Sequence, residues 1–314
     1  KNGETRGDIT ISGGSITVYA AGDTYNGQTV TNAWTDFGTA SKAPEWNATV
    51  KASVTEVVFD ESFKDVRPTS CRQWFASCTK LTTITGLTNL NTENVTSMYR
   101  MFYDCQVLTA IDLSNFKTEK VTNMAGMFYK CLKVTELDVT GFETKNVTNM
   151  ANMFDMGVTK SAWGSGYTAN VNALATLDVS KFHTEKVTSM ACMFRGCYGL
   201  KGNGLNVSNF KTGLVKNMTD MFGYCSGLTE INVAGFNTEN VTDMSKMFEY
   251  CSKVTSLNVS NFNTGKVTNM NKMFASCSKV TTLDLTNFDT QNVTDMSWMF
   301  NYCTSLTDLK ISSF

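Results

Sequence analysis

The hydrophobic residues change their spacing partway through a short unit that is clearest in residues 121–142. Residues 124–131 place two methionines, a phenylalanine and a cysteine at the i, i+3, i+4 and i+7 positions of one helix face. In residues 137–139, two apolar side chains flank an aspartate, which is the period-2 alternation of a half-exposed strand. Thr122 stands where a helix N-cap is expected. The pattern predicts a short helix and a short strand whose apolar faces need neighbouring units for burial.

The same unit recurs along most of the chain. The motif Met-x-x-Met-Phe begins at Met98, Met124, Met150, Met190, Met218, Met244, Met270 and Met296, and Cys71 opens a degenerate ninth copy. The methionine copies are 26 residues apart, except for steps of 40 and 28 residues on either side of Met190. A fixed period in this range is typical of a solenoid, in which each coil contacts only its neighbours. We expect an α/β repeat solenoid with one parallel β-sheet of about ten short strands and a short helix per coil.

Two phenylalanine positions and one cysteine position are nearly invariant among the copies, and they define the expected core. The first phenylalanine column runs from Phe75 to Phe300 and the second from Phe116 to Phe314. Cysteine follows the first column by three residues in every copy except one, which has Gly157. Side chains at one repeat position point the same way, which suits disulfide geometry poorly, so buried and reduced thiols are expected. Cys192 occupies a variable column and is expected to be exposed.

The repeat divides the chain into two regions. Residues 1–51 lack it and are expected to form an N-terminal β-rich cap, whereas residues 52–314 form the solenoid of about nine repeats. Residues 8–19 alternate polar and apolar side chains on both sides of Ser-Gly-Gly, which predicts a β-hairpin. Because the last coil ends without a polar cap, a longer natural protein is expected.

One copy is interrupted by an insertion at residues 155–173. Its 14 extra residues include Trp163 and Tyr167. Insertions in solenoids map to loops on one face, and exposed aromatic side chains are common at binding surfaces, so these two residues are candidate ligand contacts. A neutral surface loop, or a Trp163 that folds back over the gap at Gly157, is the alternative.

A second candidate surface is the outward column of the predicted strands. It contains Asp112, Asp138, Asp178, Asn206, Asn232, Asn258 and Asp284. Stacked on neighbouring strands, these side chains would offer a row of oxygens and amides to a glycan or a cation. A row of solvated side chains on an exposed sheet face is the alternative.

Composition narrows the function classes. The formal net charge is −1 and 18% of the 314 residues are charged, which argues against nucleic-acid binding and against disorder. No apolar run is long enough to cross a membrane. The single histidine, His183, lies in a variable column that is expected to be exposed, and no metal-ligand or nucleophile–base spacing is present. We therefore expect no catalytic residues, no metal and no cofactor.

The repeat also resembles a known family. The unit Asn-Val-Thr-x-Met-x-x-Met-Phe-x-x-Cys-x-x-Leu-Thr-x-Leu-Asp-Leu-Ser-Asn-Phe-x-Thr is similar to that of BspA-like leucine-rich-repeat surface proteins of bacteria, over about residues 52–314. The resemblance implies a location outside the cell, with a lipid or wall anchor supplied by a segment outside this chain. It implies adhesion as the usual role and carries no catalytic residues.

These observations predict a non-enzymatic, monomeric cell-surface adhesion protein that binds a host or extracellular protein or glycan. The alternative is a structural spacer that holds another domain away from the cell surface. A binding loop at Trp163 and Tyr167 favours the first function, and a featureless repeat surface favours the second.

Overall fold

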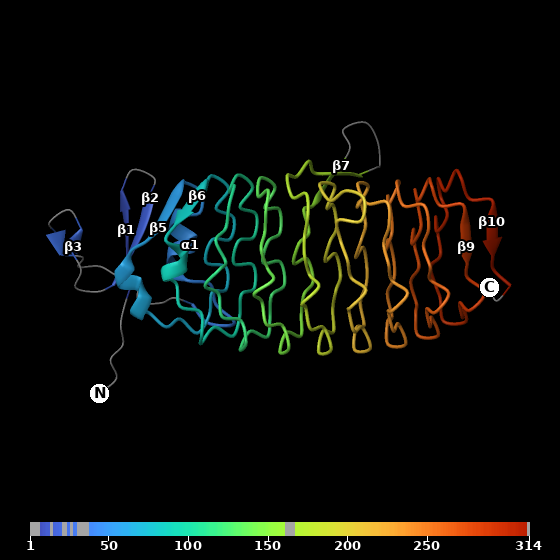
Figure 1. Cartoon of the computed structure of the whole chain (residues 1–314), viewed down its shortest axis with the longest axis horizontal. Coiled ribbons are helices and arrows are strands. Elements are labelled where there is room, and N and C mark those ends of the chain that lie inside the picture. Colours follow the sequence, from blue (N-terminus) through green and yellow to red (C-terminus); the bar gives the residue numbers. More distant parts are fainter. Residues whose placement is uncertain are drawn as a thin grey trace.

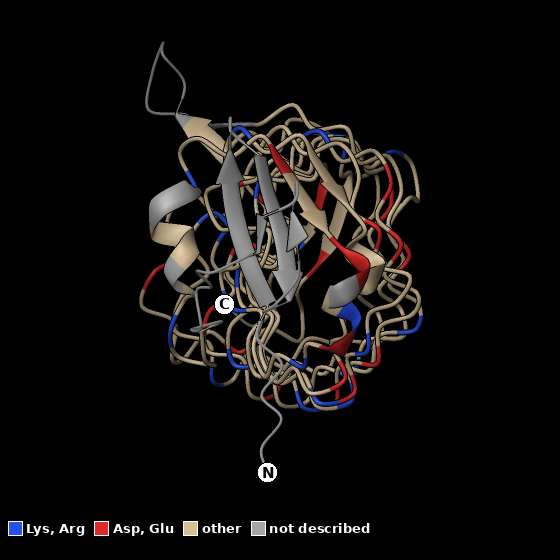
Figure 2. Cartoon of the chain, turned by 90° about the vertical axis from the view of Figure 1, so that its left-hand side faces the viewer, with Lys and Arg blue, Asp and Glu red and all other residues tan. Residues whose placement is uncertain are grey.

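The computed structural model describes residues 7–12, 15–20, 24–25, 28–29, 38–160 and 167–312. Their coils stack side by side along one axis, and a single apolar core runs through the stack from Trp46 to Met299 (Figure 1). Viewed along the stack, the backbone positions of the charged residues lie mostly around the outline of the coils (Figure 2). The predicted repeat solenoid is confirmed.

The helices and strands are few and short. In chain order they are β1 (Gly7–Ser12), β2 (Ser15–Ala20), β3 (Thr24–Tyr25), β4 (Gln28–Thr29), α1 (Glu45–Val50), β5 (Glu56–Phe59), the 3-10 helix η1 (Glu61–Asp65), β6 (Thr83–Thr85), the 3-10 helix η2 (Leu87–Asn89), β7 (Val158–Lys160), β8 (Tyr167–Ala169), β9 (Thr282–Asp284) and β10 (Asp308–Lys310). β1 and β2 pair antiparallel, which confirms the predicted hairpin.

The N-terminal elements join the solenoid directly. β2 pairs in parallel with β5, and β5 with β6, so that one four-stranded sheet has the order β1-β2-β5-β6. On α1, the Trp46 indole N–H donates to the Trp74 carbonyl at 3.0 Å, and the two indole rings meet edge to face at 5.1 Å. This contact buries Trp46 against the degenerate first copy of the repeat. The domain boundary near residue 51 stays a prediction.

The prediction of one sheet of ten strands is wrong. Among the described residues, the predicted strand positions form only two parallel pairs of named strands, β5–β6 and β9–β10. Between them, isolated bridges such as Leu177–Leu205 replace a continuous ladder. Backbone hydrogen bonds between neighbouring strand segments are few there, and the bond from the Leu177 N–H to the Gly204 carbonyl is 3.4 Å long. The neighbouring coils are held together elsewhere.

The prediction of a helix in each coil is also wrong. The Met-x-x-Met-Phe-x-x-Cys segment, which we call the turn segment, is a run of overlapping β-turns. In the coil that begins at Met98, the N–H groups of residues 101, 103 and 105 each donate to the carbonyl three residues earlier. The third residue of the segment has positive φ in every copy, which ends any α-helix. These residues are Gln73, Arg100, Gly126, Asn152, Cys192, Asp220, Lys246, Lys272 and Trp298.

Bonds between coils explain why turns replace the helix. The N–H groups of residues 98, 100, 102 and 104 donate to the carbonyls of residues 123, 125, 127 and 129 in the next coil, at 2.6 to 2.9 Å. An α-helix would use all of these groups within itself. Helical spacing of the apolar side chains is retained because the turns also return the chain to one face about every third or fourth residue.

The predicted N-cap is wrong for the same reason. Thr122 is exposed, and both its N–H and its hydroxyl donate to the Thr96 carbonyl of the preceding coil, at 2.9 and 3.2 Å. The side chain that closes the turn is Asn123, whose Oδ1 accepts the N–H of Ala125 at 2.9 Å. Asparagine or aspartate plays this part in most coils because its oxygen reaches the N–H two residues on.

A column of buried threonines joins the coils on another side. Its members are Thr92, Thr118, Thr144, Thr184, Thr212, Thr238 and Thr264, and each is at most 1% exposed. The Thr144 hydroxyl donates to the His183 carbonyl at 2.8 Å and accepts the His183 N–H at 2.7 Å. Every hydroxyl of the column donates to a carbonyl of the next coil, and all but those of Thr212 and Thr264 also accept an N–H from it, so groups that would otherwise be buried without partners are satisfied.

Phenylalanine and cysteine form the predicted columns in the core. Successive rings of the first phenylalanine column stack with centroids 5.5 to 6.0 Å apart. All ten cysteines are free, which confirms the prediction of reduced thiols. The thiols also have a hydrogen-bonding role that the sequence did not indicate. The Cys131 Sγ, for example, donates to the Phe102 carbonyl of the preceding coil at 3.2 Å.

The prediction that Cys192 is exposed is wrong. Its side chain is half-buried, and burial raises the pKa of the Cys192 thiol to about 12. Cys303, in the last coil, is half-buried as well, and burial raises its pKa above the usual value. A repeat position that varies among the copies is therefore not always exposed to solvent. At Cys192, larger neighbouring residues shield the small side chain at its positive-φ position.

We expect Thr144→Val to destabilise the solenoid by about 1–3 kcal/mol, because it leaves a buried N–H and a buried carbonyl without partners. The matched control is Thr148→Val. Thr148 is exposed, and its backbone N–H still reaches the same carbonyl as its hydroxyl, so the cost should stay within about 0.5 kcal/mol. Urea unfolding followed by circular dichroism measures both. Equal shifts for the two variants would contradict a special role for the buried column.

Thiol titration tests the cysteine column. Because thiolate is the reactive species and burial raises these pKa values, no cysteine should react quickly with a disulfide reagent in the native protein at pH 8. All ten should react after denaturation without a reductant. A rapidly reacting thiol in the native state, or fewer than ten in the unfolded chain, would contradict this arrangement.

Candidate functional site

The predicted polar column lies on the surface formed by the strand segments, which we call the strand face. Six of its members are exposed, and Asp284 is half-buried. The exposed members are Asp112, Asp138, Asp178, Asn206, Asn232 and Asn258. The structure thus brings this predicted set together on one face.

Each of these side chains also has a local structural role. The Asp138 Oδ1 accepts the Thr140 hydroxyl at 2.6 Å and the Thr140 N–H at 2.9 Å. These hydrogen bonds lower the pKa of Asp138, and equivalent bonds lower the pKa of Asp112, Asp178 and Asp284. One carboxylate or amide group thereby closes the turn after each strand segment. The second oxygen of Asp284 also accepts a hydrogen bond from Lys310 Nζ at 3.3 Å.

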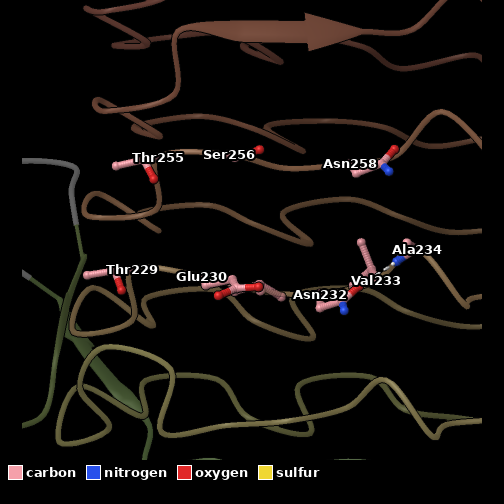
Figure 3. A pocket seen from close by; sticks show the side chains of 9 residues that line it. Thr229, Glu230, Asn232, Val233, Ala234, Thr255, Ser256 and Asn258 are labelled. Atoms are coloured by element: carbon pink, nitrogen blue, oxygen red, sulfur yellow. Dashed lines mark hydrogen bonds between the residues drawn. The ribbon is translucent and has the colours of Figure 1, made fainter.

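The strand face is hollowed at two consecutive coils. A depression of about 450 Å³ is lined by residues 229–234 of one coil and by Thr255, Ser256 and Asn258 of the next. Figure 3 shows Glu230 and Asn232 on the first coil, with Ser256 and Asn258 on the second. The walls carry hydroxyl, amide and carboxylate groups, which suits a hydrogen-bonding ligand better than an apolar one.

The insertion begins and ends as a short antiparallel hairpin of β7 and β8 at one margin of the stack (Figure 1). Tyr167 is the first residue of β8, whereas Trp163 lies outside the described residues. The candidate roles of both residues therefore stay predictions. Gly157, where the insertion leaves the coil, has φ +74°, and a Cβ there would lie 2.5 Å from the Lys130 side chain.

The coils around the insertion hold a buried charge cluster that sequence reasoning missed. The Asp155 carboxylate is fully buried, and it accepts two hydrogen bonds from the Arg195 guanidinium, at 2.8 and 3.1 Å. On its other side, Arg195 lies 3.5 Å from Asp220 Oδ2. The sequence contained a signal for this cluster. Asp155 and Arg195 occupy the same repeat position in successive turn segments, and Asp220 is the third residue of the turn segment that follows.

Asp220 is the member of this cluster that is buried without a full set of hydrogen bonds. Only 5% of the residue is exposed, and its Oδ1 has no hydrogen-bond partner among the described residues. Burial raises the pKa of Asp220 to about 7, although Arg195 opposes the shift. Burial also raises the pKa of Asp155, again against the effect of Arg195. A protonated Asp220 would relieve the missing hydrogen bond, because a carboxylic acid can also donate.

Other candidate chemistry is sparse within the described part of the chain. His183 is partly exposed, and its Nδ1 lies 3.7 Å from Glu185. No group of three or more histidine, cysteine, aspartate or glutamate side chains is arranged to hold a metal ion in the described ranges. No described helix has the length and apolar character needed to cross a bilayer.

Comparison with known families places the chain in one of them. Residues 69–162, 165–258 and 229–314 match the family described as "Mycoplasma protein of unknown function, DUF285". These ranges cover most of the solenoid, so the chain belongs to this family. The family match supports the repeat recognised in the sequence. No protein of curated function is significantly similar to the chain.

Two solved structures of bacterial repeat proteins are similar to the chain. One is a leucine-rich cell surface protein from Faecalibacterium prausnitzii A2-165, with 15% identity and a TM-score of 0.39 over 100% of this chain and 94% of that chain. The other is a leucine-rich repeat protein from Bacteroides ovatus ATCC 8483, with 16% identity and a TM-score of 0.26 over 98% of this chain and 87% of that chain. At these values the fold assignment rests on the repeat and its coils.

Asp220 should make stability depend on pH. Its pKa is about 7 in the folded protein and 3.8 ordinarily, so between these values the native state holds a proton that the unfolded chain has released. The free energy of unfolding should therefore fall as the pH rises from about 4 to about 7, and this contribution should then level off. Asp220→Asn should flatten the slope of the melting temperature against pH in this window.

The matched control is Asp243→Asn. Asp243 accepts the Ser245 N–H at 2.8 Å, and the same repeat position holds asparagine at residues 123, 149, 217 and 269. This variant should keep the wild-type slope. An unchanged slope in Asp220→Asn would show that Asp220 is not the titrating group.

Proposed function

We propose that this protein is a non-enzymatic, extracellular binding protein of a bacterial cell surface. It recognises a host or extracellular protein or glycan through the strand face. A lipid or wall anchor holds it at the cell surface. The observation that carries the proposal is the polar depression at residues 229–234, because hydroxyl, amide and carboxylate groups line it, including Asn232 and Asn258 of the polar column.

The regularity of the strand face supports recognition of an extended partner. Each coil presents one carboxylate or amide whose position is fixed by the turn that follows it, as with Asn258 and Ser260 at 2.8 Å. Groups that are already ordered lose little entropy on binding. Repetition along the stack also permits several weak contacts to act together.

Two features of the molecule argue against catalysis as the main role. Burial raises the pKa of the repeat-position thiols, so they do not supply thiolate nucleophiles. The outward carboxylates have lowered pKa values, which suits hydrogen-bond acceptors better than general acids. The similarity of the repeat to BspA-like surface proteins agrees with adhesion.

The insertion is part of the proposal in a second way. Trp163 and Tyr167 are proposed to extend the binding surface beside the coils. The alternative function is a structural spacer. The regular hydrogen bonding between coils supports it, because such bonding makes the stack stiff. Absence of any ligand for the strand face and the insertion would favour the spacer.

The strand face is tested by blocking its depression. We expect Glu230→Arg together with Ser256→Arg to reduce binding at least tenfold to any partner recovered by a glycan array or by a pull-down from mucin and extracellular matrix. The control is Glu136→Arg, because Glu136 occupies the same repeat column on a coil outside the depression. Surface plasmon resonance measures the affinities. Equal loss in the control, or unchanged binding in the double variant, would contradict the proposal.

A further inference from the structure

The turn segments of the first coils carry a continuous row of aromatic rings and cations. We call it the tyrosine–arginine row, and its members are Arg72, Tyr99, Arg100, Tyr103, Tyr129 and Lys130. The guanidinium carbon of Arg72 lies 4.1 Å from the Tyr99 ring centre, and that of Arg100 lies 5.0 Å from Tyr99 and 4.6 Å from Tyr103. Tyr103 and Tyr129 stack at 4.3 Å with an interplanar angle of 10°. Such stacking orders the cations before any ligand arrives.

A depression of about 290 Å³ lies along this row. Its small lining residues are Ala125, Gly126 and Ala151, which follow Tyr99 and Arg100 in the same repeat columns. The surface is hollow there because large side chains on one coil give way to small ones on the next two. The other lining residues are Tyr99, Arg100, Tyr103 and Tyr129 of the row, together with Asn149, Asn152 and Arg195.

The cations of the row are not held in ion pairs, although Lys130 is close enough to Asp155 to lower the pKa of that carboxyl. Among the described residues, no carboxylate lies within ion-pair distance of Arg72, Arg100 or Lys130. Arg195 at the far end differs, because Asp155 and Asp220 already hold it. Arg72 Nη1 already donates to the Ala40 carbonyl at 3.5 Å, whereas the Arg100 guanidinium has no hydrogen-bond or ion-pair partner among the described residues, so its N–H groups remain available to an anion.

We propose that this depression binds an anionic saccharide. A carboxylate or sulphate group accepts hydrogen bonds from Arg100, and the sugar ring packs against the edges of the stacked Tyr103–Tyr129 pair. The volume is at the lower end of small-molecule sites, about 300–1,000 Å³, and suits one or two sugar rings better than a peptide segment. The Asn149 Oδ1 already accepts the Ala151 N–H at 3.0 Å, which leaves the amide N–H groups of Asn149 for sugar hydroxyls.

This site is separate from the strand face. The turn segment and the strand segment each bury one side in the same core, so their exposed sides form two different faces. The proposal therefore does not depend on the depression at residues 229–234. Variants in the turn segments test this inference alone, and variants on the strand face test the proposed function alone. The failure of one can therefore be told from the failure of the other.

Isothermal titration calorimetry of the full chain tests the site with three probes. They are a heparin hexasaccharide, which is sulphated and carboxylated, a hyaluronan hexasaccharide, which is only carboxylated, and the neutral maltohexaose. Binding of at least one anionic probe, with no binding of maltohexaose, is the expected result. Binding of hyaluronan identifies a carboxylate as sufficient, and binding of heparin alone identifies sulphate as the required group.

Two variants and one matched control locate the binding. Arg100→Gln should lower the affinity for the anionic probe at least tenfold. Ala151→Tyr should also weaken it, because it fills the depression with the residue that the same column carries as Tyr99. The control is Lys272→Gln, which removes one positive charge at the repeat position of Arg100, where φ is +55° compared with +54° for Arg100. Thermal unfolding of each variant shows whether its fold is intact.

Three of the outcomes that would overturn the proposal come from the probes and the charge control. They are the absence of binding for both anionic probes at millimolar concentration, equal weakening by Lys272→Gln and Arg100→Gln, and binding of a glutamate hexapeptide as tight as that of the saccharides. The last two would indicate a general response to charge. Unchanged affinity in Ala151→Tyr with an intact fold would place the ligand elsewhere and would also overturn it.

Discussion

The hydrogen bonds between the turn segments of neighbouring coils are the constraint on which the rest of this molecule depends. Every second N–H of a turn segment donates to the next coil, as from residues 98, 100, 102 and 104. The remaining N–H groups can then be satisfied only by local turns, and these turns require positive φ at fixed positions. Buried backbone groups must find partners, so each coil must return its turn segment to the same register, and these bonds persist across the 40-residue step, as from the Met150 N–H to the Ser189 carbonyl.

The same constraint explains the residue types that recur. Identical positions in adjacent coils are placed one above the other, so phenylalanine stacks on phenylalanine and each buried threonine hydroxyl joins two coils. Cysteine suits its column because it is small and apolar, and its thiol can donate to a carbonyl of the preceding coil. Positions outside these columns are free to vary. Variation there makes both depressions, one lined by polar groups on the strand face and one beside the tyrosine–arginine row.

The insertion shows what happens where the period is broken. The coil that leaves its path at Gly157 places Asp155 in the interior, and Arg195 of the next coil pairs with it. The cluster extends to Asp220, whose buried oxygen lacks a partner among the described residues. A buried ion pair contributes less to stability than its short distances suggest, because both charges lose their hydration. Burial raises the pKa of both Asp155 and Asp220, so the stability of this part of the stack should depend on pH.

The sequence alone determined the repeat, the solenoid, the core columns and the reduced state of the cysteines, because a strict period with fixed apolar positions permits no other burial. It also placed the polar column from Asp112 to Asp284 on one face. It did not determine the local backbone, since helical spacing and a run of turns put the same residues on the same side. Only the tertiary structure decided that the N–H groups bond between coils, that Cys192 is shielded, and that Asp155, Arg195 and Asp220 meet. These outcomes depend on contacts between residues 25 or more positions apart, which no local pattern specifies.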